Sequence, residues 1–159
     1  GLDHYYGNPI SSHADDNMNL IGIGQVVAVT PDQHFNIMAC MQFVGEFGED
    51  KVHCLQKNKT NGSEKHSVAE EYHGQLLMGG NVSYAQMASL LSQGAEIKHT
   101  KLSESFTYQD YLEHHKDNLV IPLFHVEDKG RIQFCDDPDQ FTPPITSTVV
   151  ALIQSVETQ

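Results

Sequence analysis

Runs of apolar residues bounded by turn-forming sequences predict three strands in the first third of the chain. Residues 21–29 form an apolar, valine-rich run that ends at a proline-containing turn. A second run covers residues 35–44, and a third covers residues 51–57. Short runs of this kind are typical of β-strands. We therefore expect this segment to fold as an antiparallel meander that follows an irregular polar arm, residues 1–20.

The middle of the chain carries the signals of a helix with a defined start and a defined end. Ser83 and Gln86 match the S-x-x-Q capping box, in which each side chain pairs with a backbone amide at the start of the helix. Gly94 suits the left-handed residue that follows many helices. The apolar positions share one helical face: Tyr84, Met87, Ala88 and Leu91. Such a face has to cover another layer, and the neighbouring strand patterns indicate a sheet.

Two further capping boxes predict helices on either side of this one. Ser67 with Glu70 begins a helix that the glycine pair 79–80 is expected to end. Thr107 with Asp110 begins another, which is expected to continue to residue 116. Three helices are therefore expected in the middle of the chain.

The second half of the chain predicts four strands and, with the helices, the fold class. Residues 97–102 have an extended pattern, and residues 119–126 and 131–134 flank a tight-turn sequence that indicates a hairpin. Residues 145–156 form a long β-branched run with alternating positions. We expect one α+β domain over residues 21–159, an antiparallel sheet with about three helices packed on one side as a single pair of layers.

The charge balance narrows the classes of partner. The chain of 159 residues has 9 Lys and Arg against 21 Asp and Glu, a formal net charge of −12. The resulting field repels phosphate backbones and anionic lipids, so we expect no nucleic-acid partner. No apolar run approaches the ~20 residues that a membrane-spanning helix needs. We expect a protein partner and no transmembrane segment, and the oligomeric state stays open.

Ten histidines are the feature of the composition that most suggests chemistry. On the helix predicted from Ser67, the spacing of His66, Glu70 and His73 would place all three on one face. Because imidazole nitrogens and carboxylate oxygens bind zinc and copper, a metal-dependent enzyme is one alternative. The H-E-x-x-H arrangement is absent, and we favour a polar helix face in water. We accordingly expect no cofactor.

The cysteines offer a second enzymatic alternative: Cys40, Cys54 and Cys135. A hydrolase built on Cys54 or Cys135 needs a histidine beside its thiol. His53 cannot serve Cys54, because adjacent residues of a strand point to opposite faces. His34 or His125 would have to approach from elsewhere in the fold. We favour burial of each cysteine as a small apolar side chain and assign no catalytic residues.

The predicted meander also makes a disulfide between Cys40 and Cys54 a hypothesis for an oxidising compartment. If the second and third strands pair about the loop between them, position 40 lies opposite position 54. The bond requires the two Cβ atoms to approach to roughly 3.5–4.5 Å, and a register shifted by one residue would forbid it. The sequence leaves both outcomes open, and Cys135 has no partner in this pairing.

The order of motifs in the second half resembles that of a known family. A capped helix from Ser83 to Gly94 is followed by a strand at Ile97, a strand over residues 121–126 and a hairpin of the form D-x-G-x-I-x-F over residues 128–134. This order is similar to that of the VirK family, small exported bacterial proteins linked to virulence. The resemblance implies a periplasmic or secreted, non-enzymatic binding or interaction domain, and it implies no catalytic residues. A cytoplasmic location is the alternative if no signal peptide precedes Leu2.

Overall fold

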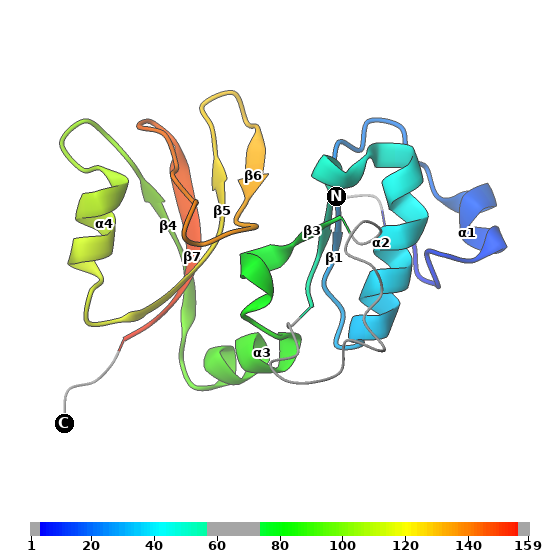
Figure 1. The fold of residues 1–159 in the computed structure, drawn as a ribbon, viewed down its shortest axis with the longest axis horizontal. Helices are drawn as coiled ribbons and strands as arrows, with labels where there is room; N and C mark the ends of the chain where they lie inside the picture. Colours follow the sequence, from blue (N-terminus) through cyan, green and yellow to red (C-terminus); the bar gives the residue numbers. More distant parts are fainter. Residues whose placement is uncertain (1–3, 57–73, 156–159) are drawn as a thin grey trace. The chain divides into compact units, whose positions relative to one another are not determined.

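The protein is described by a computed structural model over residues 4–56 and 74–155 (Figure 1). The chain forms two compact units, residues Gly1–Gln75 and Leu76–Gln159. The single domain over residues 21–159 after a short arm stays a prediction. The described residues contain four α-helices and seven strands, which form a three-stranded and a four-stranded sheet. The predicted α+β class and its antiparallel sheet are confirmed. The additional sheet was not predicted.

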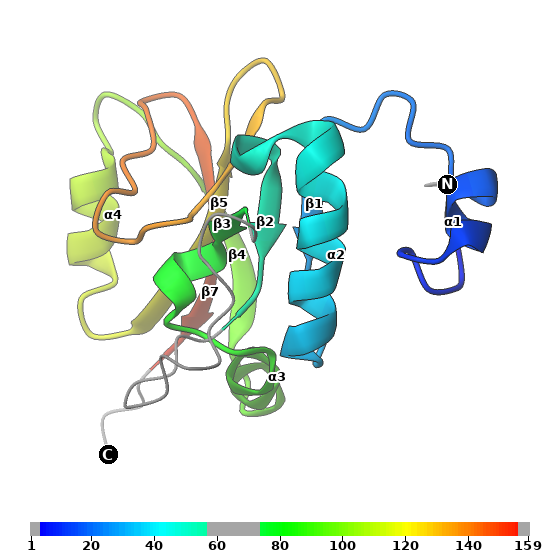
Figure 2. The ribbon, with the colours of Figure 1, turned by 45° about the vertical axis from the view of Figure 1, so that its right-hand side comes forward.

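The first unit is built around a β-α-β segment. Strand β1 (Val26–Ala28) pairs in parallel with β2 (Val52–Cys54), and helix α2 (Gln33–Phe47) connects the two. The sheet order is β1-β2-β3, with β3 (Gln75–Leu76) at the end of the unit. Figure 2 shows α2 lying alongside β1 and β2, which it contacts along its length. The residues that α2 buries recur at intervals of three and four: Asn36, Ala39, Cys40 and Phe43.

Helix α2 occupies the place of the strand that we predicted over residues 35–44, and that prediction is wrong. The Asp32 carboxylate accepts hydrogen bonds from the backbone amides of His34 and Phe35, at 3.0 and 3.2 Å, and so caps the helix. The buried positions follow the period of a helix and not the alternation of a strand. Because the connection between β1 and β2 is a helix, these strands run parallel, and the predicted antiparallel meander is wrong as well.

The other elements of the first unit differ from the prediction in type or in length. The N-terminal arm includes a short helix, α1 (Ser12–Asn17), which the Ser11 hydroxyl caps. β1 and β2 each span three residues, so the strands predicted there are confirmed only in part. A 3-10 turn, η1 (Glu49–Lys51), joins α2 to β2.

The helix predicted from Ser67 lies mostly outside the described residues, and its predicted end is wrong. Residues Gln75–Leu76 form β3, and Leu77–Gly80 form the 3-10 segment η4. Gly74 precedes them with a φ of +69°, and a Cβ atom at this position would collide with the backbone oxygen of Val52. Only glycine therefore allows the chain to approach β2 this closely.

The second unit contains an antiparallel sheet in the order β4-β7-β5-β6. β4 (Glu96–Lys101) and β5 (Leu119–Val126) lie on either side of β7 (Thr148–Gln154), and β6 (Ile132–Phe134) forms a hairpin with β5. The register places Leu152 of β7 between Ile97 of β4 and Ile121 of β5. The four strands predicted for this half are confirmed, with small shifts at their ends.

Both helices of the second unit begin where their capping boxes predict. α3 (Tyr84–Ser92) follows Ser83, whose hydroxyl accepts a bond from the Gln86 amide at 3.2 Å while the Gln86 side chain accepts one from the Ser83 amide at 3.0 Å. α4 (Tyr108–His114) follows Thr107, which pairs with Asp110 in the same way. Gly94, with a φ of +92°, follows α3 in the left-handed conformation that glycine adopts most readily.

The core of the second unit lies on the face of the sheet that α4 covers (Figure 1). Val149, Ala151 and Ile153 alternate along β7 and so point to this same face. Tyr108 stacks on Tyr111 with ring centroids 5.8 Å apart and meets Phe141 edge-on. The buried cluster contains Leu102, Tyr111, Cys135, Phe141, Val149, Ala151 and Ile153. Among the described residues, no helix has the length and apolar character needed to cross a bilayer.

Candidate functional site: an apolar hollow and a thiol pair

The candidate metal ligands His66, Glu70 and His73 lie outside the described residues, so the metal site stays a prediction. Across residues 4–56 and 74–155, no three His, Cys, Asp or Glu side chains gather in a way that could hold a metal ion. Two other features of the described structure bear on function: a hollow in the second unit and a pair of thiols in the first.

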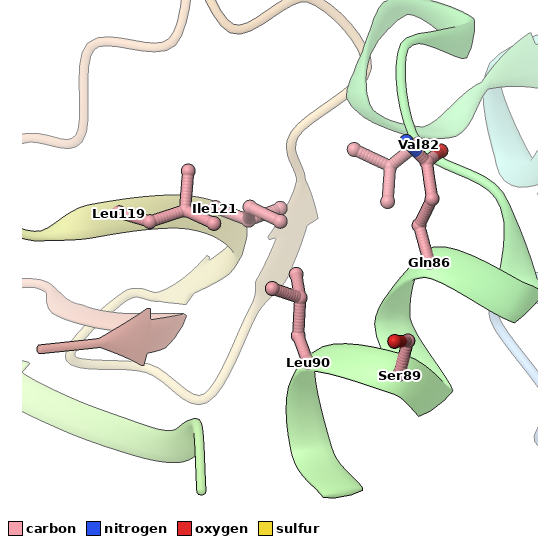
Figure 3. Close-up of a pocket in the computed structure, with 6 residues that line it drawn as sticks. All are labelled: Val82, Gln86, Ser89, Leu90, Leu119 and Ile121. Atoms are coloured by element: carbon pink, nitrogen blue, oxygen red, sulfur yellow. The ribbon is translucent and has the colours of Figure 1, made fainter. Parts of the chain in front are cut away.

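The hollow lies between α3 and β5 and has a volume of about 370 Å³ (Figure 3). Leu90 points from α3 toward Leu119 and Ile121 on the strand. The lining residues are Val82, Gln86, Ser89, Leu90, Leu119 and Ile121. Four of these six side chains are aliphatic, and none of the six is titratable. The hollow is therefore suited to an apolar group and has no side chain that could act as a general acid or base.

Strand alternation explains why β5 contributes to this hollow. Val120 packs against the buried core on the α4 side of the sheet. Its neighbours Leu119 and Ile121 therefore point to the other face, toward α3. Leu119 stays 43% exposed, so this end of the strand is apolar on both faces but covered on only one.

The α3 side of the hollow combines an apolar side chain with polar groups that already have partners. Gln86 takes part in the capping box, and the Ser89 hydroxyl accepts a hydrogen bond from the Gln93 amide group at 2.7 Å. None of the residues of α3 is buried, and Tyr84 and Leu91 are 42% and 45% exposed. The helix thus presents apolar surface to its surroundings.

The hydrophobic pattern of the chain does not by itself reveal this hollow. The pattern places Leu91 on the face that packs on the sheet, whereas in the structure Leu90 lines the hollow and Leu91 stays exposed. One available signal was that adjacent leucines on a helix point about 100° apart, so they cannot both lie at the centre of one face. The alternation of Leu119 and Ile121 with Val120 was a second signal.

The first unit brings Cys40 and Cys54 together, although not through the strand pairing that suggested it. Cys40 lies on α2 and Cys54 ends β2, and both side chains are fully buried. The Cys40 thiol lies within donating distance of the His53 carbonyl oxygen, at 3.6 Å, and close enough to Cys54 for each thiol to shift the pKa of the other. All three cysteines are free thiols here, so the disulfide stays a prediction.

The contact between the two thiols separates their acidities. The hydrogen bond to Cys54, together with burial, raises the pKa of Cys40, whereas the bond from Cys40 lowers the pKa of Cys54 against the opposing effect of burial. Cys40 has a single proton, which cannot serve two acceptors fully. It can point to the His53 carbonyl while both groups are thiols and to the Cys54 sulfur once that sulfur is ionised. Cys54 is therefore the sulfur that ionises first.

The surroundings of the cysteines do not resemble those of a hydrolase nucleophile. Burial, with smaller contributions from Asp136 and Asp137, raises the pKa of Cys135 to about 12, so this thiol forms almost none of the thiolate that a nucleophile needs near neutral pH. The His34 side chain is 86% exposed and lies beside Asp32, so it does not reach into the interior that holds Cys54. His125 packs on Phe141 with ring centroids 5.5 Å apart, and burial lowers its pKa.

No family model, no curated protein and no solved structure matches this chain. The resemblance to the VirK family therefore stays a prediction, and the site has to be interpreted from its own geometry.

Proposed function

We propose that this protein is an exported, non-enzymatic interaction domain that binds a protein partner through the apolar hollow between α3 and β5. The observation that carries the proposal is the hollow itself, in which Leu90 faces Leu119 and Ile121 across an open space. The export and the virulence-associated role rest on the resemblance to the VirK family alone.

The chemistry of the lining favours an apolar anchor from a partner over a reacting substrate. Filling such a site with one leucine or phenylalanine side chain contributes about 1.5–3 kcal/mol, which is the range in which single anchor residues dominate an interface. Tyr84 and Leu91 of the neighbouring helix surface are exposed and would extend the contact beyond the hollow. The absence of a titratable group among the six lining residues favours binding without catalysis.

Binding of Nile red, a neutral apolar dye, tests whether the hollow accepts apolar groups. We expect Leu90→Gln and Leu119→Ser to weaken dye binding several-fold. Leu112→Ser is the matched control, because Leu112 is 40% exposed on α4 and lies away from the hollow. Circular dichroism checks that each variant is folded. Equal dye affinity in the wild type and in both hollow variants would rule out this site.

Selection from a displayed peptide library tests whether the natural occupant is a polypeptide. The wild-type protein serves as bait, and Leu90→Gln serves for counter-selection. We expect the retained peptides to share an aromatic or aliphatic anchor and to displace Nile red. Peptides that bind the wild type and Leu90→Gln equally would contradict binding in the hollow.

Export is tested by the coding sequence that precedes Leu2. A basic segment, an apolar segment and a small-residue cleavage site directly before it would support export. An initiating methionine in that position, with no such segment, would contradict export and remove the main support for the VirK resemblance.

A further inference from the structure

We propose that Cys40 and Cys54 are a redox pair that a peroxide converts into a reversible disulfide, with Cys54 as the attacking sulfur and Cys40 as the resolving one. The site lies in the first unit and is independent of the apolar hollow. It differs from a permanent structural disulfide, because the thiol form is itself a packed and hydrogen-bonded state.

The fold holds the two sulfurs in contact from elements that are themselves tied together. One turn before Cys40 on α2, the buried Asn36 amide donates hydrogen bonds to the backbone oxygens of Leu55, at 2.9 Å, and Thr30, at 3.0 Å. Leu55 directly follows Cys54. The helix is therefore linked to the end of β2 beside the thiols.

The assignment of roles follows from the asymmetry of the pair. The Cys40 thiol lies within donating distance of the His53 carbonyl oxygen, at 3.6 Å, and ionisation of Cys40 would place a thiolate against that oxygen. A thiolate on Cys54 instead has the Cys40 S–H beside it as a donor, which lowers the pKa of Cys54. The sulfur with the larger thiolate fraction reacts first with an oxidant. Cys135 is equally buried but lies in the core of the second unit, with a raised pKa and no neighbouring thiol in the buried cluster around it. Cys135 is therefore the internal control that separates the effect of burial from the effect of a neighbouring thiol.

The reaction consumes one peroxide for each disulfide. The Cys54 thiolate attacks one oxygen of hydrogen peroxide, the O–O bond breaks, and hydroxide leaves and is protonated to water, which gives a sulfenic acid on Cys54. The Cys40 sulfur then attacks the Cys54 sulfur, the S–O bond breaks and a second water leaves. The two sulfurs lose two electrons and the peroxide gains them. A small dithiol reverses the bond by thiol–disulfide exchange when the unit opens or is unfolded.

Burial determines the class of oxidant. Both sulfurs are 0% exposed, so a bulky disulfide such as oxidised glutathione cannot reach them without extensive opening of the unit. Hydrogen peroxide is little larger than water and needs only a small local fluctuation. We therefore expect oxidation by peroxide to be much faster than oxidation by glutathione disulfide at equal concentration.

Non-reducing peptide mapping tests the pair in the full chain. The reduced protein is treated with a slight excess of hydrogen peroxide, unfolded in guanidinium, alkylated and digested. We expect two of the three thiols to be lost and a single intramolecular link between Cys40 and Cys54, which dithiothreitol reverses. Three alkylatable thiols after this treatment, or a link that includes Cys135, would overturn the proposal.

Serine variants test the two roles with dimedone, which traps sulfenic acids. We expect peroxide-treated Cys40→Ser to accumulate a dimedone adduct on Cys54, because no resolving thiol is present. Cys54→Ser should give at least several-fold less adduct on Cys40, and Cys135→Ser should form the same disulfide as the wild type. Equal labelling of the two single variants would overturn the role assignment, and the wild-type mapping decides the pairing even if a serine variant fails to fold.

Discussion

Helices α2 and α3 both begin at a side-chain cap, but they stand in opposite relations to the protein interior. α2 in the first unit buries Asn36, Ala39, Cys40 and Phe43 against the parallel strands. α3 in the second unit buries none of its residues and leaves Tyr84 and Leu91 exposed. Asp32 caps α2, and Ser83 and Gln86 cap α3.

This difference shows that a cap determines where a helix starts and not what the helix does. A capping side chain satisfies amides within its own first turn, and its contribution is about 1 kcal/mol whether or not the helix is buried. Burial of apolar side chains contributes several times more free energy than a cap. This contribution depends on which elements lie opposite the helix. We therefore expect changes in α2 to act on folding and changes in α3 to act mainly on binding.

The largest effect is expected for Phe43→Ala on α2. The Phe43 side chain is 7% exposed and packs between α2 and its sheet, so truncation should leave a cavity and cost about 3–5 kcal/mol of unfolding free energy. Urea denaturation followed by circular dichroism measures the loss. A loss below about 1 kcal/mol would contradict the central place of α2 in the first unit.

A loss of about 3 kcal/mol is expected for Asn36→Ala. The Asn36 side chain is fully buried, accepts a hydrogen bond from the Thr30 amide at 2.9 Å and donates one to the Leu55 oxygen at 2.9 Å. Its removal leaves several buried backbone groups without partners, each at a cost of about 1–3 kcal/mol.

The control for this change is Asn19→Ala. Asn19 also accepts a hydrogen bond from a backbone amide, that of Ile21, but it is exposed to water. We expect a loss below about 1 kcal/mol, because water can replace the lost bond. Similar losses for the buried and the exposed asparagine would show that the Asn36 network does not hold α2 to β2.

A loss of about 1 kcal/mol is expected for Ser83→Ala at the start of α3. The change removes the acceptor of the Gln86 amide, whereas Ser83→Asp keeps an acceptor at the same position and should restore most of the stability. Urea titration compares the two variants. An unchanged midpoint and m-value for Ser83→Ala would contradict the cap.

The smallest effect is expected for Leu91→Ser, which lies on the exposed side of α3. Because the Leu91 side chain is 45% exposed, the unfolding free energy should change by no more than about 0.5 kcal/mol. Urea denaturation measures this change in unfolding free energy, in parallel with that of Phe43→Ala. A loss of more than about 2 kcal/mol would show that α3 belongs to a core and would remove the contrast between the two helices.

Elements with local signals can be predicted from the amino-acid sequence alone. The starts of α3 and α4 follow from side chains three residues apart, and the β5–β6 hairpin follows from two apolar runs about a tight turn. These interactions close within a few residues, so they depend little on distant partners. The alternation that turns Leu119 and Ile121 away from Val120 is equally local, and it was the part of the hollow that the sequence contained.

Features that depend on distant partners arise from packing between elements and cannot be predicted from local signals. A short apolar run such as residues 35–44 is compatible with a strand or a buried helix, and packing across β1 and β2 selects the helix. The same packing brings Cys40 close to Cys54. The strand pairing that suggested this proximity does not form, so no local pattern predicts it correctly. The hollow arises because Leu90 is directed at β5 by the placement of α3, and that placement depends on residues far apart in the chain. Long-range packing is cooperative, and its outcome cannot be read from one segment alone.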